Sequence, residues 1–195
     1  MGTSAQNVLS GAPDQLTTGA ILSAALPPTV AKPTDLFAAT LTGFDDSGYV
    51  SEGGVAMSIS KSFAAIKDWS GSVVKRILEE FDGTIKYSHL EVSEYALQDT
   101  FGEDAVTITA ATATKGTRIE VAIGADDMPH KQRVFRMKDG AKRVVIYLPD
   151  SQVTELEEIT FVKTDAIKLG VTVSCYPDAA GKSIYILTDD GVFSA

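Results

Sequence analysis

The stretch that decides the fold runs from Gly48 to Gly102 and contains three distinctive segments: GYVSEGGV at 48–55, IKDWSG at 66–71 and EVSEYAL at 91–97. An alternating apolar and polar run, which is typical of a β-strand, follows the second segment and precedes the third. The third has the composition of a short helix. The stretch therefore predicts a long hairpin with Trp69 beside its tip, followed by one helix.

The hairpin prediction depends on alternation and on turn residues. Val55–Ile59 and Thr84–His89 alternate, and Val73–Glu80 mixes apolar with charged residues as a strand with one exposed side does. Ser70–Ser72 predicts the reversal, so we expect a long loop over about residues 58–75. A second turn is expected at Phe81–Gly83, where glycine follows aspartate.

A single helix is predicted over about residues 92–101. Leu97 and Phe101 are four residues apart and share a helical face, acidic residues in the first turn complement the helix dipole, and Gly102 suits the C-terminal end. We expect Val92, Leu97 and Phe101 to pack this helix on a sheet.

Short alternating segments with turn residues between them fill the rest of the chain. They predict a mainly β fold, a β-sandwich or barrel, with the helix lying across it. The expected strands are Val106–Ala110, Thr117–Ile123, Arg133–Met137, Arg143–Leu148, Glu158–Val162, Lys168–Cys175 and Ser183–Leu187, and Pro149–Asp150 is one of the expected turns.

The first 40 residues differ in composition from the remainder. Only Asp14, Lys32 and Asp35 are charged there, and prolines interrupt any helix. We therefore expect an extended N-terminal arm over residues 1–40, held by a neighbouring subunit, and one β domain over residues 41–195.

Composition excludes several function classes. The formal charge is −9, from 26 acidic and 17 basic residues, and no stretch gathers lysine and arginine into a stripe that would grip nucleic acid. Apolar runs such as Val144–Leu148 are far shorter than a bilayer requires, so we expect a protein without a membrane role. The basic start of a secretory signal is absent.

No catalytic or metal-binding pattern is present in the sequence. His89 and His130 lie far apart, and we expect the first in a half-buried strand and the second in a loop. Cys175 alternates with apolar residues and is expected to be a small buried side chain. Gly181-Lys182-Ser183 lacks the earlier glycine of a phosphate-binding loop. We therefore expect no cofactor and no enzyme activity.

Trp69 is the only tryptophan and lies among polar neighbours, Lys67, Asp68 and Ser70. An exposed turn rarely carries tryptophan unless a partner covers it, and protein interfaces favour this residue. The alternative is a core anchor whose loop folds back, but the polar setting favours a contact of these four residues with another chain. Tyr49 is also aromatic and is predicted to take part in the same contact.

The order and spacing of these segments resemble those of the major tail protein, or tail tube protein, of long-tailed, non-contractile bacteriophages. The resemblance covers about residues 35–187 and is strongest from Gly48 to Gly102. It implies hexameric rings that stack into a tube, with the loop around Trp69 joining one ring to the next. The segment Glu91–Phe101 is similar to the helix on the outside of the family's sheet.

The resemblance also implies a lumen and partners. Lumen walls in this family tend to be acidic, and Glu79, Glu80 and Asp82 are the candidates because they lie on or beside the predicted hairpin strands. Implied partners are further copies of the chain, a tape-measure protein, tail terminator and baseplate or distal tail proteins, and double-stranded DNA in transit. The implied location is the virion tail, after synthesis in the host cytoplasm.

Two other functions remain open at this point. A related β-sandwich virion component, such as a tail terminator or head-decoration protein, would form closed rings only. An enzyme or small-molecule binder would need a motif that the sequence does not contain.

Overall fold

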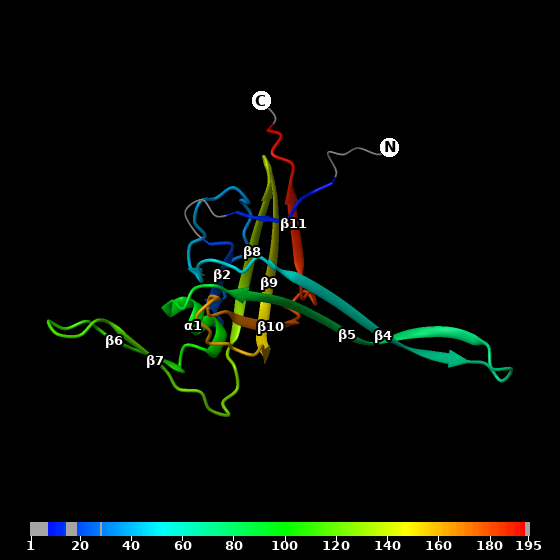
Figure 1. The fold of residues 1–195 in the computed structure, drawn as a ribbon. Helices are drawn as coiled ribbons and strands as arrows, with labels where there is room; N and C mark the ends of the chain where they lie inside the picture. The colour runs from blue at the N-terminus through cyan, green and yellow to red at the C-terminus, as the bar shows by residue number, and fades with distance from the viewer. Residues whose placement is uncertain (1–7, 15–18, 28, 194–195) are drawn as a thin grey trace.

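The computed structural model describes residues 8–14, 19–27 and 29–193, which form eleven strands and one helix. Figure 1 shows strands in the body and two hairpins that project from it on opposite sides. The elements are β1 Ala12–Pro13, β2 Ile21–Ala25, β3 Asp45–Asp46, β4 Ala56–Lys67, β5 Val73–His89, α1 Glu94–Phe101, β6 Val106–Thr109, β7 Arg118–Val121, β8 His130–Asp139, β9 Lys142–Leu156, β10 Leu169–Tyr176 and β11 Tyr185–Asp189.

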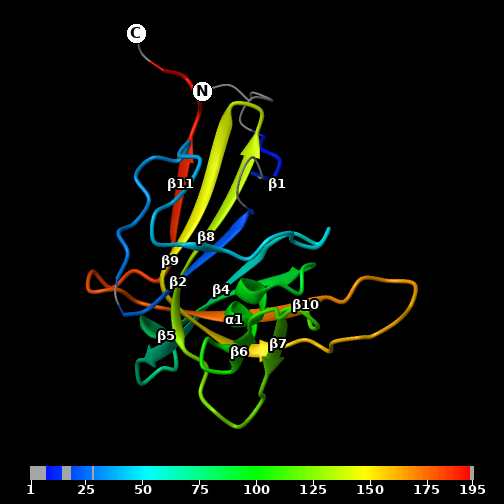
Figure 2. The ribbon, with the colours of Figure 1, turned by 90° about the vertical axis from the view of Figure 1, so that its left-hand side faces the viewer.

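Nine strands form one antiparallel sheet in the order β3-β2-β8-β9-β10-β5-β4, with β1 added beside β8 and β11 beside β9. The long strand β9 pairs with β11 along residues 143–147 and with β10 along residues 150–156. The sheet therefore has two halves, and in Figures 1 and 2 the strands β8, β9 and β11 run across β10 and β5. The mainly β prediction is confirmed.

The main core lies where the two halves of the sheet face each other. Ile21 and Phe135 come from one half, Ile85 and Val173 come from the other, and all four are fully buried. Cys175 belongs to the same cluster, as the sequence predicted, and burial raises the pKa of its thiol to about 12. The body is thus a packed domain with an inert cysteine.

The expected N-terminal arm is corrected where the structure describes it. Ile21–Ala25 is strand β2, paired with β8 along its whole length, and Ile21 and Leu22 are at most 1% exposed. Asp14 is also buried, and its carboxylate forms an ion pair with Arg143 Nε at 3.0 Å. Long-range pairing with β8, which local composition does not reveal, makes this segment part of the body. Met1–Asn7, residues 15–18 and Pro28 lie outside the described residues.

Two expected turns are instead parts of strands. β5 runs through Phe81–Gly83 without a break, and a side chain at Gly83 would begin 3.0 Å from Ile184, so glycine permits close packing there rather than a reversal. β9 likewise runs through Pro149 and Asp150. These two residues lie opposite Gln132 alone, which is a β-bulge, the place where a strand tolerates proline.

Two smaller predictions also differ from the structure. Glu158–Val162 is a loop rather than a strand. His130 begins strand β8 instead of lying in a loop, and its Nδ1 is 2.6 Å from the Asp150 carboxylate. Both errors concern short segments whose conformation depends on contacts with distant parts of the chain.

The helix is present but begins two residues later than predicted. Ser93 is the N-cap, and its hydroxyl accepts a hydrogen bond from the Ala96 N–H. Leu97 and Phe101 pack in a second apolar cluster with Leu169, as expected. Val92 precedes the cap and is 51% exposed, so its predicted packing role is wrong.

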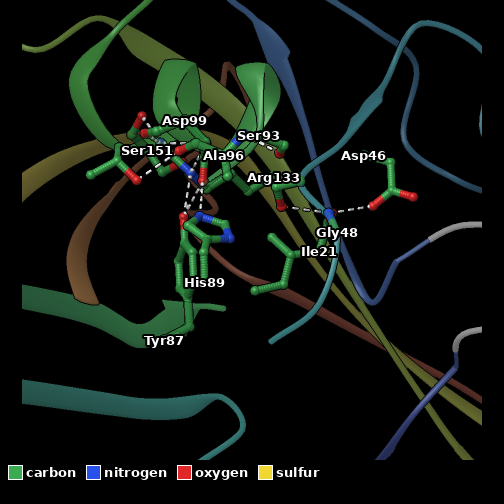
Figure 3. Close-up of polar contacts among 12 residues, drawn as sticks. Ile21, Asp46, Gly48, Tyr87, His89, Ser93, Ala96, Asp99, Arg133 and Ser151 are labelled. Atoms are coloured by element: carbon green, nitrogen blue, oxygen red, sulfur yellow. Dashed lines mark hydrogen bonds and ion pairs between the residues drawn. The ribbon is translucent and has the colours of Figure 1, made fainter. Parts of the chain in front are cut away.

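A buried polar network, the Asp99 network, fixes the helix to both halves of the sheet (Figure 3). The Asp99 carboxylate accepts hydrogen bonds from the Tyr87 hydroxyl at 2.6 Å and from Arg133 Nε at 3.1 Å, and His89 Nε2 lies 3.2 Å away. Arg133 also donates to the Ser151 hydroxyl. His89 is fully buried rather than half-buried. The network therefore joins α1, β5, β8 and β9.

Charge compensation keeps Asp99 ionised in this dry environment. Burial opposes ionisation, but the Arg133 guanidinium and His89 outweigh it and hold the pKa of Asp99 well below its usual range. Burial, together with the neighbouring carboxylate, raises the pKa of Tyr87. The ion pair between Asp99 and Arg133 is thus a condition for the position of α1.

Replacing Asp99 with asparagine should strongly destabilise the fold. The change leaves the Arg133 charge buried without its counter-ion, which costs about 3–5 kcal/mol. Because the carboxyl pKa is depressed in the folded state, this stabilisation is present above the ordinary carboxyl pKa of about 4 and is lost as the pH falls below it. Urea unfolding of the parent and Asp99→Asn proteins from pH 7 to pH 2.5, a range set around that pKa of about 4, measures both effects.

Asp165→Asn is the matched control for this prediction. Asp165 is exposed and its ion pair with Lys168 lies in solvent, so its replacement should change the unfolding midpoint far less than Asp99→Asn does at every pH. An Asp99→Asn protein as stable as the parent, with the same acid sensitivity, would contradict the role given to the network.

Candidate assembly surface

The long hairpin of β4 and β5 is the feature that most distinguishes this molecule. Residues 84–89 of β5 pair with β10, and residues 84–86 also pair with β4 on the other side, whereas residues 73–83 have β4 as their only partner. Every side chain from Val73 to Asp82 is exposed. Figure 1 shows this part extending away from the body. The hairpin predicted around residues 58–75 is therefore longer than the sequence indicated.

The projecting hairpin has two chemically different faces, because residues paired across antiparallel strands point to the same side. The apolar face carries Ile59, Phe63, Leu78 and Phe81, each between 40% and 51% exposed. This much apolar surface on an extended two-stranded ribbon is typical of a protein contact.

The polar face lies on the opposite side. It is formed by the pairs Ser58 with Thr84, Ser60 with Asp82 and Ser62 with Glu80. Glu79 is the extra residue of the β-bulge that follows the last pair. The three candidate lumen residues, Glu79, Glu80 and Asp82, thus all lie on the exposed part of β5. The alternating serines at 58, 60 and 62 were a sequence sign of the longer strand.

The tip of the hairpin is an ordered turn built around one carboxylate. Asp68 accepts hydrogen bonds from the Ser70 hydroxyl at 2.7 Å and the Ser72 N–H at 2.8 Å, and Gly71 has a φ of 88°. The Ser70 hydroxyl and then the Ser72 N–H lower the pKa of Asp68. The turn is therefore held by local bonds, with the carboxylate ionised.

Trp69 lies on this turn with its whole side chain in solvent, at 105% relative exposure. An indole is the largest apolar group that a protein can offer to a partner, and an ordered turn lowers the entropy lost on contact. Lys67, Asp68 and Ser70 surround it, so the structure brings these four predicted residues together.

Tyr49, the fifth predicted contact residue, does not belong to the tip. Its carbonyl accepts a hydrogen bond from the Leu90 N–H and its own N–H donates to Glu91, which places it beside the body end of β5. Tyr49 is 62% exposed. Any contact that it makes is separate from the contact at Trp69.

A second hairpin, β6 with β7, leaves the body on the side opposite the long hairpin (Figures 1 and 2). The sequence predicted strands at Val106–Ala110 and Thr117–Ile123 but not that they form a sheet of their own. At their base lies a pocket of about 420 Å³ between the end of α1 and residues 122–129. The molecule therefore has a projection on each side and a pocket beside the shorter one.

Chemical sites are not found in the described part of the chain. No group of three or more histidine, cysteine, aspartate or glutamate side chains there is placed to hold a metal ion. The described helix is too short and too polar to cross a membrane. The exposed side chains of the long hairpin offer a surface for contacts between proteins.

Comparison with known proteins agrees with this arrangement. The family model described as phage tail tube protein matches residues 1–195, the whole chain. A search of curated proteins found no match.

Several solved structures are similar to this chain. The tube-terminating cap of the anti-feeding prophage is 10% identical with a TM-score of 0.44, covering 93% of this chain and 94% of that one. A chain in the virion of a native gene transfer agent is 8% identical with a TM-score of 0.38, and the match covers 80% of this chain and 89% of that one. A third match is to the sheath–tube complex of an extracellular contractile injection system in its extended state. The sequence identity is 9% and the TM-score 0.35, and the match covers 96% of this chain and 99% of that one. On the strength of the family match, the chain belongs to the phage tail tube protein family and is a structural protein of the virion.

Proposed function

We propose that this chain forms hexameric rings that stack into the tail tube of a long-tailed phage, and that double-stranded DNA leaves the particle through the lumen. The observation that carries the proposal is the long hairpin, whose apolar face and tip are uncovered within its own chain. Such a surface is stable in water when a further copy covers it.

The polar face of the hairpin suits the wall of a DNA conduit. Between residues 58 and 62 of β4 and residues 79 and 84 of β5 it carries three carboxylates, serine and threonine hydroxyls, and no cation. A negative surface repels the phosphate backbone, so DNA passes without being held. We propose that Glu79, Glu80 and Asp82 line the lumen.

A structural role of this kind requires partners of stated kinds. We propose a tape-measure protein inside the tube before ejection, a terminator at one end and baseplate or distal tail proteins at the other. The role requires no cofactor and no catalytic group, because assembly alone produces the conduit.

Electron microscopy of the purified protein over a series of concentrations tests the proposal. We expect hollow tubes of one diameter, because each added ring presents the same hairpins to the next. Closed rings without tubes would instead support a terminator or decoration protein. A monomer at every concentration would overturn the proposal.

Shortening the long hairpin should abolish tube formation and leave the body folded. Joining Ser60 to Asp82 through an Asn-Gly turn preserves a natural cross-strand pair and removes no buried side chain. The melting temperature should therefore stay within about 5 °C of the parent value. Circular dichroism and electron microscopy measure the two effects, and tubes of normal length from the shortened protein would refute the assignment.

Trp69→Ala should weaken assembly by itself. The loss of a central aromatic contact raises the concentration needed for tubes by more than about tenfold. Phe161→Ala is the control, because Phe161 is also an exposed aromatic residue, at 77%, in a loop away from the hairpin. Pelleting assays compare the three proteins, and equal assembly by all of them would show that Trp69 makes no contact.

A further inference from the structure

The pocket beside the β6–β7 hairpin, here called the acidic pocket, has three carboxylates in its lining. Its lining includes Phe101, Asp104, Ile123, Asp126, Asp127 and Met128, and its volume is about 420 Å³. The aromatic and aliphatic side chains form an apolar floor. None of the three aspartates takes part in an ion pair with another described residue, and no lysine or arginine lines the pocket.

The end of the long hairpin carries the opposite charge. Lys67, Lys75 and Arg76 lie within a few residues of Trp69, and the single carboxylate there, Asp68, is engaged by the turn. None of the three cations has an ion-pair partner among the described residues. The tip therefore combines a bare indole with an excess of positive charge.

The tip and the acidic pocket cannot meet within one molecule. Figures 1 and 2 show the long hairpin leaving the body on one side and the end of α1 with residues 122–129 on the other. A contact between them must join two copies, and each copy then still offers one free tip and one free pocket. A head-to-tail contact of this type builds an open polymer.

We propose that the Trp69 tip of one copy docks in the acidic pocket of a copy in the next ring. The indole covers the floor formed by Phe101, Ile123 and Met128, and the tip cations face the three aspartates. This inference rests on the proposed stacking function and adds to it the receiving surface. Electrostatic complementarity sets the order and orientation in which copies join.

The groove at the root of the long hairpin is a poorer receiving surface. It lies between the apolar face and the β10–β11 connection, and its lining includes Lys61 and Lys182 with Asp82 as a carboxylate. Two lysines oppose a positively charged tip. The hairpin of the receiving copy also forms one wall of this groove, so that hairpin would obstruct an incoming tip.

Reciprocal charge reversal tests the docking. The tip variant is Lys75→Glu with Arg76→Glu, and the pocket variant is Asp126→Lys with Asp127→Lys. Each alone should raise the concentration required for tubes by more than about tenfold, because like charges then face each other. Combining all four changes in one chain should restore assembly. Glu157→Lys with Glu158→Lys, an exposed pair outside the pocket, is the matched control and should assemble normally.

Disulfide trapping tests the contact itself. Ser70→Cys protein and Ile123→Cys protein are mixed at an assembling concentration and oxidised mildly. The buried Cys175, with its raised pKa, leaves no competing thiol. We expect a covalent dimer from the mixture and none from either protein alone.

The outcomes separate the two proposals. If the parent protein forms tubes but the mixture gives no dimer and the fourfold variant is not rescued, the acidic pocket is not the receiving surface and the stacking function stands. If the parent protein forms no polymer and the mixture of cysteine variants gives no dimer, both proposals fail. Circular dichroism shows that each variant remains folded, and a failure to assemble counts only for folded variants.

Discussion

Strand β5 imposes the constraint on which the rest of the structure depends. It is one hydrogen-bonded strand of 17 residues, which is exposed to solvent at its first residue, Val73, and buried at its last, His89. An isolated two-stranded hairpin is marginally stable in water. The projecting half is therefore held in place because its other half pairs with β10 in the sheet of the body.

The body end of this strand is held by contacts that leave little freedom. Ile85 and Tyr87 point into the main core, and Tyr87 and His89 also bond to Asp99 on the helix. Gly83 lies at the point where β5 leaves the body, and its missing side chain lets the strand pass close to Ile184. The packing at this root sets the direction in which the hairpin leaves the body. Preorganisation of this kind reduces the entropy lost in assembly.

Local patterns in the sequence predicted the elements that depend on neighbouring residues. Alternation predicted the hairpin strands, and Leu97 and Phe101 predicted the buried face of the helix. The polar setting of Trp69 agrees with its exposure in the structure.

Features that depend on distant residues were missed. Ile21–Ala25 is a strand only because β8, more than a hundred residues later, supplies its partner. Pro149 is tolerated in β9 because a bulge lies opposite Gln132. The fold brings Asp99 to Arg133 and Asp104 to Asp126, and no local pattern in the sequence predicts either pairing.

The fluorescence of Trp69, the only tryptophan in the chain, tests the contact between rings most directly. The emission of the dilute protein reports an indole in full contact with water, and iodide should quench it readily. As the concentration rises and tubes form, the account predicts that the emission moves to shorter wavelength and that quenching is lost, in step with the amount of sedimenting protein. Tubes whose Trp69 keeps its solvent-exposed emission and its full sensitivity to iodide would contradict it.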